Sequence, residues 1–164
     1  MSSHNSGREY EIVVEKIIDK LNSVKEQLHL GKIEGEQRIK GKSGEWHMEV
    51  VAYDAGNGKP VLVECKHWSR KIPRDILAGL AYKIKDVGGE RGIIVSTLGL
   101  QKGALDIAKH ENIEVIILKR EATSDNYDLV LPSRGRHHVG MSAVVKFKEE
   151  LRFIGLSKRK KSKG

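Results

Sequence analysis

Two glutamates and one lysine are the residues of this chain whose types and spacing suit phosphate chemistry. Glu64 and Lys66 are separated by one residue, and Glu49 lies in the preceding strand-like segment. Carboxylate oxygens suit a hard cation such as Mg²⁺, which usually keeps waters and takes phosphate oxygens of a substrate. A lysine beside such an ion stabilises phosphate charge and helps to position a metal-bound water. Metal-assisted chemistry on a phosphate group is therefore one interpretation of this trio.

The segments that carry these residues are predicted to form a β-hairpin. The Asn-Gly dipeptide at 57–58 is the strongest short hairpin signal. If it is a two-residue turn, residues 56 and 59 pair and Glu49 lies opposite Lys66. Because side chains alternate along a strand, Glu49, Glu64 and Lys66 then converge on one face, and Asp54 points to the other. A bulge near Pro60 would shift the register by one residue and reverse this assignment.

An ordinary cross-strand salt bridge on a solvated face is the alternative to a catalytic cluster. The strand context argues against it, because apolar residues 61–63 directly precede Glu64. Burying charges in such a strand is costly unless they are paired or bind a cation. Cys65 is predicted to point to the opposite face as a small core residue.

The elements that must position these residues follow from the apolar pattern of residues 8–118. Helices are predicted at 8–28, at 73 up to the glycines at 88 and 89, and at 101–111, and strands at 36–40, 46–54, 61–68, 92–96 and 113–118. This order predicts an α/β sandwich in which a mixed sheet is flanked by helices. Residues 127–131 resemble a further strand, and 143–153 are ambiguous between strand and helix.

Charge is concentrated near the C-terminus of the chain. The 164 residues include 30 Lys and Arg against 22 Asp and Glu, a net charge of +8. Residues 119–164 contribute +7 of this total, from 12 basic and 5 acidic side chains. Such a surplus predicts a polyanionic partner, and the basic run at 158–163 suits non-specific phosphate contacts. A role in solubility alone is the alternative for this run.

Several classes of protein are disfavoured by composition. The single cysteine excludes an intramolecular disulfide framework and a multi-cysteine zinc site. No apolar run approaches the roughly 20 residues of a membrane helix, and residues 1–7 lack the apolar core of a signal peptide. We therefore expect a cytoplasmic location without membrane association.

An acidic residue, a hairpin and then Glu-x-Lys resemble the PD-(D/E)xK nuclease superfamily. The stretches 41–50 and 64–68, and later 92–97 with the helix that contains Gly103-Ala104, are similar more specifically to Mrr-type restriction endonuclease domains. The resemblance spans about residues 7–118. It implies a restriction-endonuclease-like α-β-β-β-α-β-α-β sandwich. The expected organisation is a disordered N-terminus at 1–7, a nuclease core at 8–118, a C-terminal extension at 119–157 and a disordered basic tail at 158–164.

The resemblance also implies roles for individual residues. Glu49 and Glu64 would bind Mg²⁺, for which Mn²⁺ could substitute, and Lys66 would orient the attacking water and stabilise the transition state. Glu11 follows an aromatic residue in the opening helix, as in the family, and would help to hold a second metal or a metal-bound water. A solvated first-turn glutamate is the alternative for Glu11. The family usually has Asp where this chain has Glu49, which puts the strength of metal binding in question.

The implied reaction is hydrolysis of a DNA phosphodiester by an endonuclease. DNA contacts are predicted at these basic residues: Arg70, Lys71, Arg74, Lys158, Arg159, Lys160 and Lys161. Trp68 is interpreted as packing rather than as a platform for a base. A double-strand cut would favour a homodimer. The alternatives are a Holliday junction resolvase-like nuclease and a non-catalytic DNA-binding module with a degenerate site.

Overall fold

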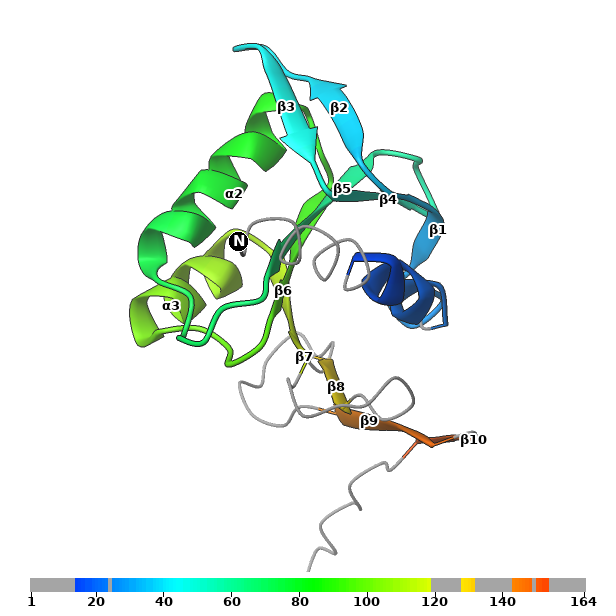
Figure 1. Cartoon of the computed structure of the whole chain (residues 1–164). Helices are drawn as coiled ribbons and strands as arrows, with labels where there is room; N and C mark the ends of the chain where they lie inside the picture. The colour runs from blue at the N-terminus through cyan, green and yellow to red at the C-terminus, as the bar shows by residue number, and fades with distance from the viewer. Residues whose placement is uncertain (1–13, 24, 119–127, 132–142, 149, 154–164) are drawn as a thin grey trace, which may run out of the picture.

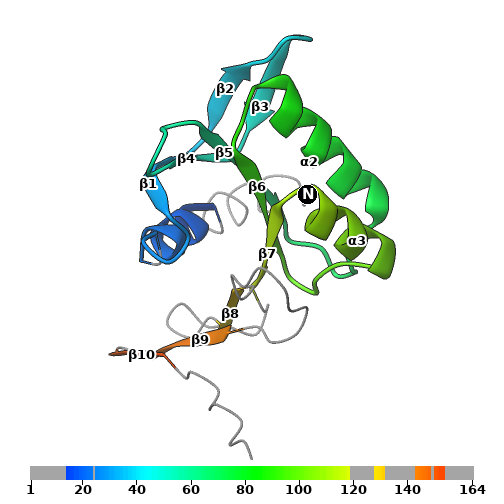
Figure 2. The same cartoon turned by 180° about the vertical axis from the view of Figure 1, so that it is seen from behind.

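A mixed β-sheet lies between two helical layers (Figure 1). The computed structural model describes residues 14–23, 25–118, 128–131, 143–148 and 150–153. Helical residues 14–23 cover one face of the sheet, whereas α2 (Arg74–Asp86) and α3 (Lys102–His110) cover the other. Figure 2 shows the same two layers from behind. This is the α/β sandwich that the order of elements predicts.

The main sheet has eight strands in the order β1-β4-β5-β6-β7-β8-β9-β10, and β2 and β3 form a separate two-stranded sheet. The strands are β1 (Leu30–Glu34), β2 (Gln37–Lys40), β3 (Glu45–Met48), β4 (Val50–Asp54), β5 (Pro60–Lys66), β6 (Arg91–Ser96), β7 (Ile113–Leu118), β8 (Asp128–Leu131), β9 (Ala143–Lys148) and β10 (Glu150–Phe153). The β5, β6 and β7 strands are parallel, and the outer pairs are antiparallel. Mixed pairing of this kind results when hairpins extend a parallel βαβ core.

The N-terminal helix is shorter at its C-terminal end than its apolar spacing predicts. The described helix covers 14–23, and residues 25–29 form a turn. In that turn Leu30 N–H donates to the carbonyl of Lys25, and His29 adopts a left-handed φ of 51°. Leu28 is still buried in the core cluster, so the apolar periodicity reflects burial rather than continued helix. Residues 8–13, where the helix is predicted to start, lie outside the described residues.

The α2 helix holds one face of the sheet in place. It begins at Arg74, one residue after the predicted start at Pro73, and buries Leu77, Leu80 and Ile84 against the strands. It ends where Gly88 adopts a φ of +66°, the left-handed conformation that glycine tolerates after a helix. The β6 strand, fully buried along its length, lies under this helical layer.

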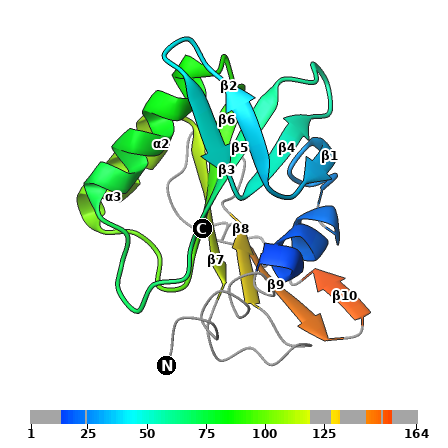
Figure 3. The same ribbon diagram turned by 45° about the horizontal axis from the view of Figure 1, so that its top comes forward.

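Two details of the strand pattern differ from the prediction. Residues 46–54 do not form one strand, because a bend at Glu49 separates β3 from β4. Residues 30–34, for which no strand is predicted, form β1 and pair with β4. Figure 3, in which the top of the molecule comes forward, shows the β2–β3 ribbon in front of the main sheet. Five strands therefore precede α2, where three were predicted.

The strands beyond residue 118 extend the sheet. Residues 128–131 form β8, and the ambiguous segment 143–153 forms β9 and β10. The predicted ends of the chain, 1–7 and 158–164, lie outside the described residues. The division into a core at 8–118 and an extension at 119–157 stays a prediction.

Candidate active site

The β4–β5 hairpin has a longer turn than the Asn-Gly dipeptide predicts. Val50 pairs with Val63, and Asp54 N–H donates to the carbonyl of Lys59. The connection is therefore residues 55–58, and the register is shifted by two residues from the predicted one. A shift of two preserves which side chains share a face. The observed pairing ends at Val50 and Val63, one residue before Glu49 and Glu64 on the two strands.

Asp54 belongs to the turn. Its Oδ1 accepts the backbone N–H groups of Gly56 at 2.9 Å and Asn57 at 3.2 Å. These bonds lower the pKa of Asp54 and are typical of an aspartate that stabilises its own turn. The carboxylate of Asp54 is thus engaged by the backbone of its own turn.

Glu64 and Lys66 form an ion pair at the C-terminal end of β5. Lys66 Nζ lies 2.5 Å from Glu64 Oε1, and the two side chains are only 19% and 14% exposed. They share the face of β5 that is covered by α2, whereas the intervening Cys65 is buried in the opposite core. The alternation along the strand is therefore as predicted.

A second lysine from α2 joins this pair. Lys83 Nζ lies 3.3 Å from Glu64 Oε2, so each carboxylate oxygen of Glu64 faces a different ammonium group. Lys83 Nζ also lies 5.7 Å from the centre of the Trp46 ring, within cation–π range. The sequence motif does not identify Lys83, because its approach depends on how α2 packs across β5.

Opposing effects act on the carboxyl group of Glu64. Burial raises its pKa, but the hydrogen bond and charge of Lys66, together with Lys83, lower it by more. The pKa of Glu64 is therefore below its ordinary value, and the group is a carboxylate at neutral pH.

Glu49 lies at the bend between β3 and β4 and has an unsatisfied oxygen. Its Oε2 is buried and has no hydrogen-bond partner among the described residues. The charges of Glu49 and Glu64 both help to raise the pKa of Cys65, after the larger effect of burial. Both carboxylates therefore act on the same region of β5. A buried, unpartnered carboxylate oxygen is costly in a purely structural role.

The β2–β3 ribbon that leads into Glu49 is anchored to α2 by Asp86. Asp86 Oδ2 accepts the indole N–H of Trp46 at 2.8 Å and the hydroxyl of Ser43 at 2.9 Å, and Oδ1 accepts Ser43 N–H at 3.0 Å. A Cβ at Gly41 would lie 1.9 Å from Asp86 Oδ2, so only glycine permits this approach. The Trp46 ring also meets Tyr82 edge to face at 6.0 Å.

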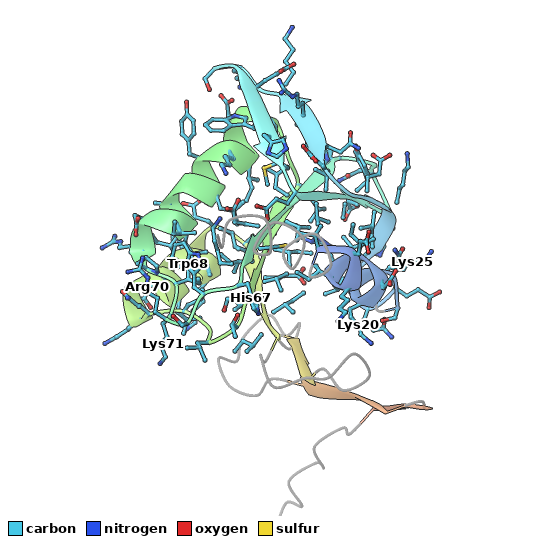
Figure 4. All side chains as sticks on the ribbon, viewed as in Figure 1. Lys20, Lys25, His67, Trp68, Arg70 and Lys71 are labelled. Carbon is cyan, nitrogen blue, oxygen red and sulfur yellow. The ribbon has the colours of Figure 1, made fainter. Side chains whose placement is uncertain are left out.

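The loop after β5 carries the predicted basic contacts. Figure 4 shows His67, Trp68, Arg70 and Lys71 gathered there. The Arg70 guanidinium lies 4.9 Å from the centre of the Trp68 ring, and Lys66 Nζ lies 5.9 Å from it. Arg70 and Lys71 are exposed. Trp68 therefore makes cation–π contacts with Arg70 and Lys66. It also packs against the core, as predicted.

The remaining residues predicted to contact DNA are Arg74 and the basic residues at 158–161. Arg74 is exposed at the start of α2, and its stem lies along α3, where a Cβ on Gly103 would meet it at 3.6 Å. Glu11 and the basic residues 158–161 lie outside the described residues. Within the described ranges no group of three or more His, Cys, Asp or Glu is arranged to hold a metal ion, and no helix there is long and apolar enough to cross a membrane.

Comparisons with solved structures find similar chains. A crystal structure of a protein of unknown function, AF1548, matches with a TM-score of 0.51 and 16% identity over 62% of this chain and 56% of that one. A structure of EndoMS in apo form matches with a TM-score of 0.39 and 19% identity over 63% of this chain and 46% of that one. The chain thus matches about half the length of these two proteins. A comparison with curated proteins finds no match.

Comparison with family models identifies the domain itself. The restriction endonuclease family Mrr_cat matches residues 3–123, which include the N-terminal helix, both helices of the opposite layer and strands β1 to β7. The match agrees with the resemblance carried by the Glu-x-Lys motif and its preceding hairpin, and it covers well over half of the 164 residues. The chain belongs to the Mrr-type restriction endonuclease family.

Proposed function

We propose that this protein is a divalent-metal-dependent endonuclease that hydrolyses phosphodiester bonds of DNA. The observation that carries the proposal is the buried Oε2 of Glu49, which has no partner among the described residues, together with the Glu64–Lys66 ion pair of the Glu-x-Lys motif. Such an oxygen is retained at a cost in stability unless a ligand satisfies it in the working state. Membership of a restriction endonuclease family supplies the reaction class.

The donor set of this cluster fits a hard divalent cation. Mg²⁺ is typically held by one or two carboxylates, and it keeps several waters and takes phosphate oxygens of the substrate. Glu49 and Glu64 provide two carboxylates, and Glu49 Oε2 is free of protein partners in the described part of the chain. The bound ion would act as a Lewis acid on the scissile phosphate, and Mn²⁺ would substitute for it.

Lys66 has the position of a group that acts on the reacting phosphate. Its ammonium group is one-fifth exposed and is held by Glu64 on the same strand face. From there it would orient the attacking water and stabilise the negative charge that develops on the phosphate. Glu11 is proposed to help hold a second metal or a metal-bound water.

DNA contacts are proposed at three places. Arg70 and Lys71 are exposed on the loop after β5, next to Lys66 along the chain. Arg74 at the start of α2 and the basic tail at 158–161 would add contacts to phosphates. Such contacts carry affinity without sequence information, so we expect weak sequence specificity from this chain alone. A double-strand cut would be made by a homodimer with two sites.

Cleavage of supercoiled plasmid tests the proposal. Wild-type protein with Mg²⁺ or Mn²⁺ should nick or linearise the plasmid, EDTA should prevent this, and Lys66→Ala should abolish it. Arg38→Ala is the matched control, because it removes an equal charge from the exposed β2–β3 ribbon. Absence of cleavage together with salt-sensitive DNA binding would instead indicate a binding module. A strong preference for four-way junctions would indicate a resolvase.

A further inference from the structure

The course of the Lys83 side chain is unusual for a residue at the end of a helix. Lys83 and Lys85 both lie in the last turn of α2, where basic residues interact favourably with the helix dipole. Lys85 is 68% exposed and pairs with Glu111 at 2.6 Å. Lys83 is 23% exposed and extends inward to Glu64. Since the helix dipole acts on both residues alike, it does not explain the inward course of Lys83.

Charge counting shows what this inward lysine does to the cluster. Two ionised carboxylates, Glu49 and Glu64, would balance the two positive charges of Lys66 and Lys83. A divalent cation held by the two carboxylates would give the cluster a surplus of about two positive charges. Groups this little exposed are costly to leave with uncompensated charge, so a bound anion would then be favoured. Under the proposed function, that anion is a DNA phosphate.

Of the two lysines, Lys83 is the one better placed to exchange partners. Its contact with Glu64 is 3.3 Å long, compared with 2.5 Å for Lys66. Its Nζ also lies over the Trp46 ring at 5.7 Å, which keeps the ammonium group at the site when Glu64 is engaged elsewhere. Trp46 is held in turn by its bond to Asp86.

We propose that Lys83 is a second substrate-binding cation of this site, which pairs with Glu64 in the metal-free protein and with a DNA phosphate when a divalent cation takes Glu64. This inference rests on the proposed function and assigns a role to a residue outside the Glu-x-Lys motif. It predicts that Lys83 competes with the metal in the absence of DNA. It also predicts that Lys83 strengthens DNA binding mainly when a divalent cation is present.

The first experiment measures metal binding without DNA. Mn²⁺ binding is followed by electron paramagnetic resonance for wild type, Lys83→Met and Lys85→Met. Loss of the competing ammonium group should tighten Mn²⁺ binding about threefold to tenfold in Lys83→Met. Lys85→Met removes the same charge from the same helix turn and should leave Mn²⁺ affinity unchanged. Equal affinities for wild type and Lys83→Met would overturn the competition.

The second experiment measures how DNA affinity depends on salt. A phosphate contact contributes about one unit to the slope of log affinity against log salt concentration. With Ca²⁺ present, Lys83→Met should reduce this slope by about one, whereas in EDTA the reduction should be smaller. Lys83→Arg should retain the slope, because it keeps the charge. An identical reduction in Ca²⁺ and EDTA, or none in either, would overturn the exchange of partners.

Two further readouts keep this inference separate from the proposed nuclease activity. In Mg²⁺, Lys83→Met should raise KM for DNA about tenfold and change kcat less, because the contact already exists in the bound ground state. If Lys83→Met does not fold, Lys83→Gln replaces it in all three measurements. If wild type cleaves DNA but Lys83→Met behaves as Lys85→Met does, the inference fails and the proposed function stands. If no cleavage occurs but Mn²⁺ binding tightens in Lys83→Met, the proposed function fails while metal competition by Lys83 stands.

Discussion

The indole N–H of Trp46 donates to the carboxylate of Asp86 across 2.8 Å, which fastens the β2–β3 ribbon to the end of α2. The same carboxylate also accepts the Ser43 hydroxyl and backbone N–H. Because β3 leads directly into Glu49, this anchor determines where the chain enters the candidate active site. The same contact holds the Trp46 ring beneath Lys83.

We expect Asp86 to stabilise the fold in a pH-dependent way. The Trp46 bond, followed by the Ser43 bonds, outweighs burial and lowers the pKa of Asp86. A lowered pKa gives stability that is present above the unfolded-state value of about 3.9 and is lost as pH falls through the folded-state value. Thermal melts should show Asp86→Asn melting about 3 °C below wild type at pH 7. The difference should shrink below about pH 4.

The exposed Asp106 on α3 provides the control for this prediction. Asp106→Asn should leave the melting temperature near that of wild type across the whole pH range. A gap between wild type and Asp86→Asn that stays constant down to pH 2 would show that charge at Asp86 is not what stabilises the ribbon.

Loss of charge at Glu49 and loss of charge at Asp54 should have opposite effects on DNA cleavage and on melting temperature. Glu49→Gln should reduce metal-dependent cleavage by about 100-fold or more, because a neutral amide is a poor ligand for a hard cation. Its melting temperature without metal should equal or exceed that of wild type, since a neutral amide costs less to bury without a partner than a carboxylate does. Plasmid cleavage and thermal melts measure the two effects.

Asp54→Asn serves as the comparison within the same hairpin. It should cleave within about twofold of wild type and melt at a lower temperature, because the bonds from Gly56 and Asn57 to its carboxylate weaken. The reverse outcome, an essential Asp54 and a dispensable Glu49, would place the metal site at the turn and refute the assignment of Glu49.

Trp68 and Arg70 should act as one unit in DNA binding. The guanidinium lies 4.9 Å from the ring centre, so removal of the ring should release Arg70 from a fixed position. Each single alanine variant should weaken DNA binding about fivefold. The Trp68→Ala, Arg70→Ala double variant should bind no more weakly than either single variant. Fluorescence anisotropy of labelled duplex DNA measures all affinities.

Lys71 offers the matched comparison, because it is a neighbouring exposed cation. Its effect should add to that of Trp68→Ala, since in the described part of the chain the cations over the Trp68 ring are those of Lys66 and Arg70. Strict additivity of Trp68→Ala and Arg70→Ala would show that the stacked arrangement does not matter for DNA binding.

The basic tail should contribute affinity that is independent of DNA sequence. Removing residues 158–164 deletes five basic side chains. Affinity for random-sequence duplexes should fall and the salt slope should become shallower, whereas kcat at saturating DNA should not change. A tail with the same residues in scrambled order should restore binding. An unchanged salt slope would leave solubility as the function of the tail.

The sequence by itself was sufficient for the class of fold and for the shared face of Glu64 and Lys66. Apolar periodicity depends on local geometry, so it identified α2, α3, β6 and β7 close to their actual bounds. The hairpin register was predicted two residues away from the observed one, yet Glu64 and Lys66 share a face as predicted, because side chains alternate with a period of two. The family was recognisable for a related reason, since its motif is a short, local arrangement of residues.

Only the tertiary structure showed the features that depend on contacts between distant segments. The bend at Glu49 and the separate β2–β3 ribbon arise because Asp86, some 40 residues further along the chain, holds Ser43 and Trp46 against α2. Lys83 reaches Glu64 across 19 residues of sequence because α2 packs on β5. Such contacts leave no periodic signal in the chain, since they depend on where two whole elements meet rather than on the conformation of either one.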